Sequence, residues 1–316
     1  MRIIRSAIGS SASLGFLKFL KENGFHLIGT DITELCVGKF ITDEFYLVPR
    51  ASDEFGVVER YAEIAKKTAA SWIISGPETE IEVLLKHQNE IPTPVFHLPY
   101  DTFKIITDKY LLSQFLVKSN IKAKCPLTVL LKDVQLTSFQ SSDKLVLKPS
   151  QGRGSRGVVI IKTSELKDYK DRLTSEPYVV QPFLNGKEYT VDTLHDFEGK
   201  VLNIVPRERL VTESGISTVT RTVKEDKLIE AVVELSSVLK FSGANCMQFI
   251  QQGSEFFLTD VNPRFGGGSI LSLKASDTFA QNVIHLLKNE KDKLKYNSFD
   301  YKELTMLRGY DEYYQG

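Results

Sequence analysis

The sequence predicts a chain of mixed α/β and α+β class, and three observations support this prediction. An apolar run at residues 2–8 precedes a turn rich in glycine and serine, an amphipathic stretch at 14–23 and a second apolar run at 26–31. This is how an α/β layer begins. From residue 108 onward, short β-rich segments dominate instead. Of the 316 residues, 42% are hydrophobic and 25% charged, so the chain is long enough for two or three globular modules.

The N-terminal elements follow from hydrophobic periodicity and from residues that break it. Gly24 ends the first helix, and residues 26–31 form the second strand. The expected continuation is a helix at 54–69, a strand at 71–75 and a helix at 79–88. The proline-rich segment 91–99 marks the boundary of this module.

The second region has a different order of elements. It begins with a helix at 108–119. The β-rich segments that follow lie at 126–131, 144–149, 157–162 and 177–183. After them we expect a strand at 188–194, a helix at 225–240, a β-hairpin at 244–261 and a helix at about 269–288. This order indicates α+β architecture.

Charge and cysteine content indicate which kinds of partner and which cellular compartment to expect. Lys plus Arg and Asp plus Glu both number 40, so no basic excess points to a nucleic-acid partner. The three cysteines are far apart and lie in apolar segments, which indicates reduced core residues in a cytoplasmic protein. No uncharged apolar run is long enough to span a membrane. Polar residues interrupt the first apolar stretch, so we expect no signal peptide.

A glycine-rich segment at residues 152–157 matches the pattern G-x-G-x-x-G. A dinucleotide fingerprint would run from a strand into a helix, whereas these glycines connect two apolar strands. A hairpin of this kind can fold over phosphates and offer backbone N–H groups; a plain flexible hairpin is the alternative. Lys148 lies in the preceding apolar strand and favours the phosphate interpretation, because a buried lysine needs an anionic partner. The alternative for Lys148 is an edge strand facing water.

Protein kinases also use a glycine hairpin, and residues 152–158 fit their pattern. In kinases, however, the lysine follows the loop, and H-R-D and D-F-G motifs come later in the chain. Residues 195–199 read H-D-F-E-G, without the arginine and with different glycine spacing. The kinase interpretation therefore fails.

A second group of polar residues lies at the end of the expected hairpin. Asp260 and Asn262 alternate on a strand and project from one face, as suits oxygen ligands of magnesium. If Gln251 pairs with Glu255 across a three-residue turn, Gln248 shares this face. A polar amide in an apolar strand needs a partner, and a metal ion or its water would serve. A hairpin end that is merely polar is the alternative.

Several arginines lie close to these residues. Arg264 precedes the glycines 266–268, which open the last helix together with Ser269 and could bind an anion; a helix-capping turn is the alternative. Arg207 and Arg209 alternate on a strand and would share one face. There they could contact a transferring phosphate or a carboxylate; a solvated charged strand is the alternative.

The order of these parts resembles the ATP-grasp superfamily, and in particular the short relatives of the carbamoyl-phosphate synthase large chain and similar carboxylate–amine ligases. The resemblance covers residues about 105–290. It implies ATP and Mg²⁺ as cofactors. It also implies a Rossmann-like N-terminal (pre-ATP-grasp) domain over 1–100, followed by an ATP-grasp fold with a small subdomain carrying the flap over 101–180 and a large subdomain carrying the metal site over 181–316.

The resemblance also assigns roles to positions. For the nucleotide it implies Lys109, Lys148, Gly152, Gly154, Ser155, Gly157, Gln181, Phe183, Leu184 and Glu188. The hinge begins with Gln181 where the family usually has an acidic residue, while Phe183 would offer backbone groups to the adenine edge. For the metal it implies Gln248, Asp260 and Asn262, with Asp260 in place of the usual glutamate. The candidate catalytic residues are Arg264, Lys148 and, from the strand argument above, Arg207.

The implied activity is ligation of a carboxylate to an amine through an acyl phosphate, with ADP and phosphate as products. The partners would be small-molecule carboxylates and amines, with no nucleic acid and no membrane, and a homodimer is compatible with this activity. One alternative is an ATP-binding regulatory protein with little turnover. Another is an NAD-dependent oxidoreductase using residues 9–15 and Asp31. That loop lacks the G-x-G-x-x-G spacing, so we expect no nicotinamide binding.

Overall fold

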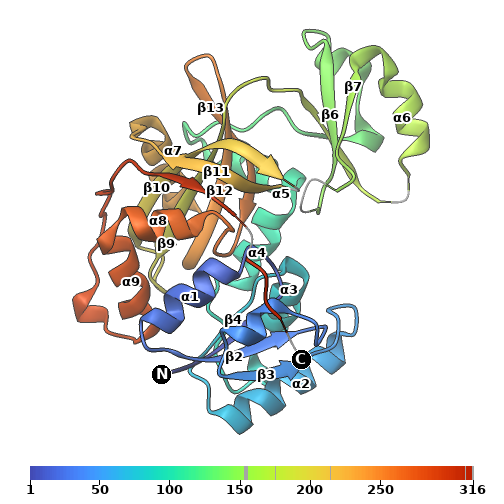
Figure 1. Cartoon of the computed structure of the whole chain (residues 1–316). Helices are drawn as coiled ribbons and strands as arrows, with labels where there is room; N and C mark the ends of the chain where they lie inside the picture. Colours follow the sequence, from blue (N-terminus) through green and yellow to red (C-terminus); the bar gives the residue numbers. More distant parts are fainter. Residues whose placement is uncertain (153–155, 175, 214, 310, 315–316) are drawn as a thin grey trace.

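The N-terminal segment folds into a parallel sheet whose strands are connected by helices. In the computed structural model, which describes residues 1–152, 156–174, 176–213, 215–309 and 311–314, the strand order is β3-β2-β1-β4 (Figure 1). The strands are β1 (Arg2–Ser6), β2 (His26–Asp31), β3 (Glu44–Leu47) and β4 (Trp72–Ile74). The helices are α1 (Leu14–Glu22), α2 (Glu54–Thr68) and α3 (Glu78–Lys86). This order is half of a doubly wound sheet, and the expected Rossmann-like fold is confirmed.

A small antiparallel sheet follows, reached through α4 (Tyr100–Thr107) and α5 (Lys109–Ser119). Its strand order is β5-β8-β6-β7. The strands are β5 (Val129–Leu130), β6 (Lys144–Pro149), β7 (Val159–Lys162) and β8 (Tyr178–Pro182). Helix α6 (Leu166–Arg172) contributes Leu166 to the apolar cluster on one face of this sheet. In Figure 1, β6, β7 and α6 project from the rest of the molecule.

A six-stranded antiparallel sheet forms the centre of the C-terminal half, in the order β13-β12-β9-β10-β11-β14. The strands are β9 (Glu188–His195), β10 (Val201–Glu213), β11 (Ile216–Thr222), β12 (Gly243–Gln252), β13 (Glu255–Asn262) and β14 (Thr305–Leu307). The accompanying helices are α7 (Asp226–Val238), α8 (Ser269–Ala275) and α9 (Asp277–Leu287). Helix α7 packs on one face with α4 and α5, and α9 packs on the other with α1. Within the described ranges, no helix is long and apolar enough to cross a membrane.

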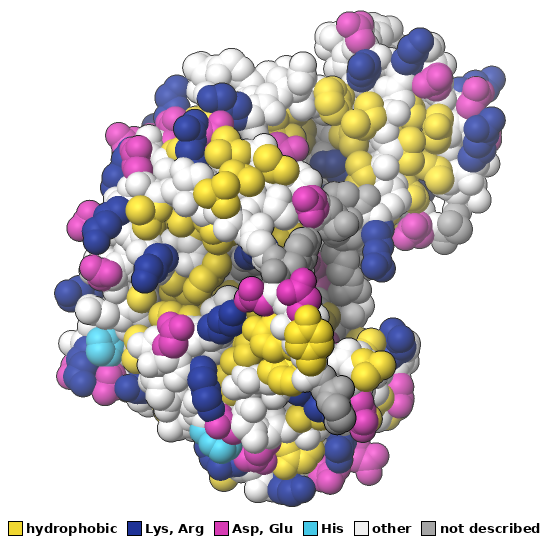
Figure 2. All heavy atoms as spheres, in the orientation of Figure 1, with side chains coloured by type: hydrophobic (Ala, Val, Ile, Leu, Met, Phe, Trp, Pro, Cys, Tyr) yellow, Lys and Arg dark blue, Asp and Glu magenta, His cyan; other side chains and the backbone are white. Residues whose placement is uncertain are grey.

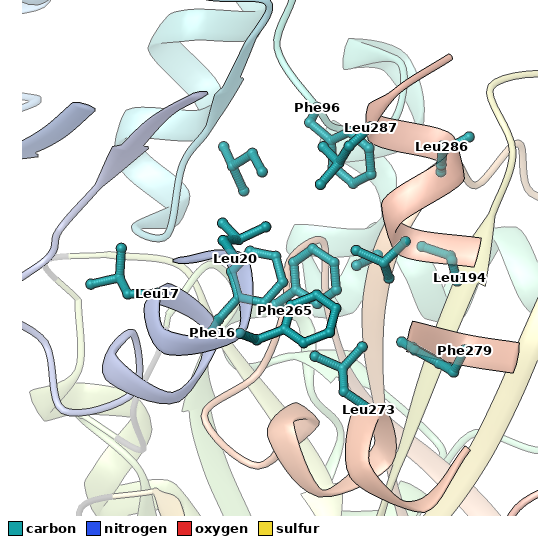
Figure 3. Close-up of a cluster of buried hydrophobic side chains, with 14 of the residues drawn as sticks. Phe16, Leu17, Leu20, Phe96, Leu194, Phe265, Leu273, Phe279, Leu286 and Leu287 are labelled. Atoms are coloured by element: carbon teal, nitrogen blue, oxygen red, sulfur yellow. The ribbon is translucent and has the colours of Figure 1, made fainter. Parts of the chain in front are cut away.

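A shared hydrophobic core joins the N-terminal sheet to the large sheet. Figure 3 shows Phe16 and Leu20 of α1 facing Phe265 and the helices after it. The rings of Phe16 and Phe265 stack with their centroids 4.1 Å apart, and Phe96 lies 6.3 Å from Phe265. Because these rings are buried, their contact removes apolar surface of both modules from water and holds the modules together.

The predicted class is confirmed, but individual elements differ. The helix expected over 269–288 is wrong as a single element, because Ser276 leaves the helical region and its hydroxyl accepts from the Phe279 N–H (3.2 Å) at the start of α9. Strands β3, β11 and β14 and helices α4 and α6 were not predicted. Strand β3 has four residues and β14 three, which is too short for a hydrophobic period to register.

The H-D-F-E-G sequence belongs to the turn between β9 and β10. The Asp196 carboxylate accepts from the backbone N–H groups of Glu198 (2.9 Å) and Lys200 (2.8 Å). Asp196 therefore shapes a hairpin turn, in agreement with the rejection of a kinase motif.

Candidate active site

A cavity of about 290 Å³ opens between the small sheet and the large sheet. Figure 2 shows the surface hollowed between the lobe formed by β6, β7 and α6 and the rest of the molecule. Most of the predicted site residues line this cavity, namely Lys109, Lys148, Gly152, Gln181, Phe183, Leu184, Glu188, Gln248 and Asp260. Residues predicted from separate sequence motifs are thus brought together at one place.

The cavity has an apolar part and a charged part. On β6, the cavity face carries Val146 and then Lys148, and on β12 it carries Ile250 and then Gln248. The other apolar lining residues are Pro149, Val158, Ile160, Pro182, Phe183, Leu184, Tyr189 and Phe249. The charged lining residues are Lys109, Lys148, Arg156, Glu188, Arg209 and Asp260. Such a division fits a ligand with a planar apolar group and an anionic group.

Lys109 and Asp260 meet in the charged part. The Lys109 ammonium lies 3.4 Å from an Asp260 carboxylate oxygen and donates to the carbonyl of Gly152 (3.1 Å). Lys109 is the first residue of α5, and the Asp108 side chain caps this helix by accepting two backbone N–H groups of the first turn (2.9 and 3.0 Å). The cap fixes the end of the helix from which the lysine extends.

Lys148 is a partly buried cation on the cavity face of β6. Burial lowers the pKa of its ammonium, and neighbouring Lys109 acts in the same direction while Asp260 opposes it. Within the described part of the chain, its ammonium makes no hydrogen bond and no ion pair within 4 Å. A desolvated cation without a close partner favours an anionic ligand.

Gln248 and Asp260 lie directly opposite each other on β12 and β13. The predicted register of this hairpin was wrong, because Glu255 pairs with Gln252 and the turn has two residues instead of three. That shift alone would turn Asp260 to the other face of the sheet. A β-bulge at Thr259 compensates for it. Gln248 and Asp260 therefore share the cavity, as expected, for a different geometric reason.

Asn262 and Arg264 extend from Asp260 toward the N-terminal domain and are not among the described residues that line the cavity. The Asn262 amide nitrogen donates to Asp260 (3.3 Å), and its oxygen accepts from Arg264 (3.3 Å). Arg264 also lies 3.7 Å from the carboxylate of Glu78 at the start of α3. The two predicted residues thus contact the cavity through Asp260.

His97 contacts the chain between Asn262 and Arg264. Its Nδ1–H donates to the carbonyl of Pro263 (2.8 Å). Burial lowers the pKa of His97 to about 3, so the imidazole is neutral near pH 7. The N-terminal domain therefore fixes the chain between Asn262 and Arg264 with a neutral hydrogen bond. Sequence analysis did not identify this contact, because the two residues are far apart in the chain.

Arg207 and Arg209 share one face of β10, but only Arg209 lines the cavity. Arg207 is 2% exposed, and its Nε and Nη2 groups donate to the two oxygens of Asp192 (2.6 and 3.1 Å). The structure therefore places Arg207 in a buried ion pair, contrary to the expected catalytic position. Arg209 takes the place at the cavity, where it donates to the amide oxygen of Gln248 (3.3 Å) and lies 3.4 Å from Glu188.

The predicted flap is described in part. Gly152 lines the cavity, whereas Gly157 does not and has a φ of +71°, a backbone conformation that favours glycine. A Cβ atom at Gly157 would approach the Tyr178 hydroxyl to 2.9 Å. The predicted contacts from Gly154 and Ser155 lie outside the described residues.

The hinge expected at residues 181–184 borders the apolar part of the cavity. Gln181 is 4% exposed. The backbone N–H of Phe183 donates to the carbonyl of Lys144 (3.0 Å), so it serves the sheet and not a ligand. Glu188 begins β9 and faces Arg209.

The oxygen donors in the charged part have the chemistry of a hard-cation site. No group of three His, Cys, Asp or Glu residues in the described ranges is placed to hold a metal ion. A cation at Asp260 would therefore depend on the amide oxygens of Gln248 and Asn262. Each of these oxygens accepts from an arginine, Arg209 and Arg264 respectively. The donor types fit Mg²⁺, provided that the cation replaces these two hydrogen bonds.

The N-terminal loop uses its own acidic residue internally. The backbone N–H of Gly9 donates to the Asp31 carboxylate (2.8 Å), and Asp31 is 8% exposed. A Cβ atom at Gly9 would approach Cys36 Cβ to 2.9 Å. Asp31 therefore closes the turn between β1 and α1.

The lining residues that were not predicted from the sequence come from several strands and from the turns beside them. They include Val146, Arg156, Ile160, Thr212 and Gly215. Strand alternation from Lys148 would have found Val146. Thr212 and Gly215 depend on the β10–β11 pairing, which no local motif marks.

Comparison with known proteins by sequence agrees with this arrangement. Residues 174–306 match a family described as ATP-grasp in the biosynthetic pathway with Ter operon. Pyruvate carboxylase of Bacillus subtilis is 28% identical over 137 residues, which are 38% of this chain and 12% of that protein. The carbamoyl phosphate synthase large chain of Lachnoclostridium phytofermentans is 22% identical over 275 residues, which are 82% of this chain and 24% of that protein. The matches thus span less than a quarter of the length of these relatives.

Solved structures match over almost the whole chain. The biotin carboxylase domain of 2-oxoglutarate carboxylase from Hydrogenobacter thermophilus has a TM-score of 0.75 and 15% identity, covering 95% of this chain and 72% of that one. An L-amino acid ligase from Bacillus licheniformis has a TM-score of 0.70 and 17% identity, covering 93% and 77%. These likenesses establish the fold. The family match, which includes the strands of Gln248 and Asp260, shows that residues 174–306 are similar to ATP-grasp proteins.

Proposed function

We propose that this chain is an ATP-dependent ligase that joins a carboxylate to an amine through an acyl phosphate. The observation that carries the proposal is the convergence of Lys109, Lys148, Gln248 and Asp260 in one cavity beside an apolar part. The lysines would bind the nucleotide phosphates, and the apolar part would hold the base. The Hydrogenobacter domain was solved with MgADP and bicarbonate, and the Bacillus licheniformis protein is named an amino acid ligase, which supports the proposal.

The proposal includes Mg²⁺ bound by Asp260, Gln248 and Asn262. When bound, the cation neutralises charge on the phosphate oxygens. The chain's own residues orient the nucleotide: Lys109 from the start of α5, Lys148 from β6, and Gly152 from the segment that follows β6.

In the proposed reaction, an oxygen of the substrate carboxylate bonds to the γ-phosphorus while the bond to the bridging oxygen breaks and ADP leaves. Lys148 lines the cavity and counters the charge on the transferring group, while Arg264 acts from outside the cavity through Asn262 and Asp260. The amine then attacks the acyl carbon, phosphate leaves with the electrons of the C–O bond, and the amine loses a proton. No side chain acts as a nucleophile, so positioning and electrostatics supply the catalysis.

The test is ATP-dependent phosphate release measured against a library of carboxylates and amines. We expect a carboxylate–amine pair that yields ADP and phosphate in equal amounts with the amide. AMP and pyrophosphate as the stoichiometric products would contradict the acyl phosphate. Saturable ATP binding without turnover on any pair would favour the regulatory alternative.

A further inference from the structure

Gln181 lies on the cavity face of the small sheet. On β6 and β8, Leu145, Leu147 and Val180 point into the apolar cluster beneath α6. Their neighbours Val146 and Gln181 pair across the two strands and line the cavity instead. Strand alternation therefore places the Gln181 side chain at the apolar part of the cavity, where the proposed function puts the base.

A chain of two hydrogen bonds fixes how this amide is turned. The Thr128 hydroxyl donates to the carbonyl of Pro126 (2.8 Å), and the Gln181 amide nitrogen donates to the Thr128 oxygen (2.9 Å). A carbonyl oxygen only accepts, so the single hydroxyl proton of Thr128 is used there. The Thr128 oxygen can then only accept, which requires the NH₂ group of Gln181 to face it. The amide oxygen of Gln181 therefore lies on the side of the amide group that faces away from Thr128.

The environment makes the reversed amide costly. Thr128 and Gln181 are each 4% exposed, and Pro126 is buried. If the Gln181 amide were reversed, its oxygen would face the Thr128 oxygen. Thr128 could then donate to Gln181 only by giving up its hydrogen bond to the Pro126 carbonyl. A buried polar group without a partner costs more than an ordinary hydrogen bond contributes. This chain of hydrogen bonds from Gln181 through Thr128 to Pro126, called the relay below, therefore keeps the amide oxygen of Gln181 on the cavity side. A glutamine without such contacts could present either its oxygen or its NH₂ group there.

We propose that Thr128 is a positioning residue for base selection: it holds Gln181 as an acceptor that favours a purine with a 6-amino group over one with a 6-oxo group. This inference rests on the proposed ATP site. Adenine presents a donor at that position and guanine an acceptor, so an acceptor on the protein pairs with the first and repels the second.

The test is isothermal titration of the full chain, with Mg²⁺, against ATP, GTP and purine riboside 5′-triphosphate, which lacks the 6-amino group. The wild type should bind ATP about three- to tenfold more tightly than purine riboside triphosphate, the range expected for one neutral hydrogen bond. Thr128→Val removes the relay at nearly constant volume and should bring this ratio close to one. Thr128→Ser keeps the hydroxyl and should keep the ratio.

Binding of GTP gives the sharper readout. In Thr128→Val the amide of Gln181 is free to turn and donate, so GTP should bind more tightly than to the wild type. A damaged fold would not produce this gain. Gln181→Leu should also abolish the ATP preference, and adding Thr128→Val to it should not change the ratio further.

The outcomes separate the two proposals. Wild-type chain without saturable binding of any of the three nucleotides would overturn the proposed ATP site, and the relay with it. Wild-type binding of ATP together with an unchanged ATP to purine riboside ratio in Thr128→Val would overturn the relay alone.

Discussion

Asp260 has three neighbours in the cavity and its hairpin. We therefore expect it to be the main ligand of the proposed cation. It lies 3.4 Å from the Lys109 ammonium, accepts from Asn262 (3.3 Å) and stands opposite Gln248. Asp260→Ala should reduce ATP turnover about a hundredfold or more, as loss of one key electrostatic group does. Its partly exposed ion pair contributes at most about 1 kcal/mol, so the free energy of unfolding should change little. Phosphate-release kinetics and denaturant titration measure the two effects.

The matched control for Asp260 is Glu255 at the other end of the same strand. Glu255 is exposed and pairs with Lys124 outside the cavity (2.8 Å). Glu255→Ala should keep normal turnover and magnesium dependence. If Asp260→Ala behaved in the same way, Asp260 would have no place in the site.

Lys148 illustrates a conflict between stability and binding. Burial lowers the pKa of its ammonium, which means that the folded state disfavours the charge. Lys148→Met should therefore raise the free energy of unfolding at pH 7 by roughly 1 kcal/mol, the size of a common stabilising substitution. The same change should weaken ATP binding, because the phosphate loses its cation. Lys144→Met, on the exposed start of the same strand, should change neither quantity; a less stable Lys148→Met with intact ATP affinity would contradict the assignment.

At the scale of elements, the ion pair between Asp192 and Arg207 connects β9 and β10 with the start of α8. Asp192 also accepts from Cys246 (3.0 Å) and Ser269 (2.8 Å). Burial by itself raises the pKa of Asp192, but the charge and hydrogen bonds of Arg207 outweigh it, and the pKa lies below its ordinary value. The ionised carboxylate thus belongs to the framework that holds α8 against the sheet.

This shift predicts a pH dependence of stability. Because the folded-state pKa is depressed, the contribution of Asp192 is complete above its unfolded value of about 4 and is lost as the pH falls through the folded value. Asp192→Asn should lower the free energy of unfolding by about 3–5 kcal/mol at pH 7, since Arg207 is left buried without its partner. The difference from wild type should shrink below pH 4. Denaturant titrations across pH measure it.

A surface carboxylate provides the comparison for Asp192. Asp101 pairs with Lys104 (2.9 Å), and its side chain is 91% exposed. Asp101→Asn should change the free energy of unfolding by less than about 1 kcal/mol at any pH. A constant difference between wild type and Asp192→Asn down to pH 2 would show that Asp192 is not the titrating group.

The elements also show what sequence patterns can and cannot predict. Strand β6 was predicted with correct bounds, because its apolar run ends at Pro149. Alternation predicted that Arg207 and Arg209 share a face, but not their depth, which depends on α8 closing over the end of the sheet. The hairpin of Gln248 and Asp260 was predicted with the wrong turn, and only the bulge at Thr259 restored the shared face. Long-range packing and bulges leave little trace in local sequence.

At the scale of the whole molecule, two regions are candidates for the nucleotide site. The N-terminal sheet has the topology of a dinucleotide fold, and the cavity between the other two sheets has the charged and apolar lining described above. Buried aromatic contacts such as Phe16 with Phe265 fuse the N-terminal sheet to the large sheet. His97 also donates a hydrogen bond to the Pro263 carbonyl. Through these contacts the N-terminal domain supports the chain next to the cavity.

The last prediction decides between these two parts. A dinucleotide site needs a free acidic residue after the second strand to bind a ribose hydroxyl, but Asp31 is buried and accepts from the N–H of Gly9 (2.8 Å). Opening that contact would leave the Gly9 N–H without its acceptor. Isothermal titration with NAD and NADP should therefore show no saturable heat, while ATP with Mg²⁺ should bind. Asp31→Asn keeps a side-chain oxygen for Gly9 and should leave ATP binding unchanged. Micromolar NAD binding that disappears in Asp31→Ala would instead place a nicotinamide site in the N-terminal domain and revive the oxidoreductase alternative.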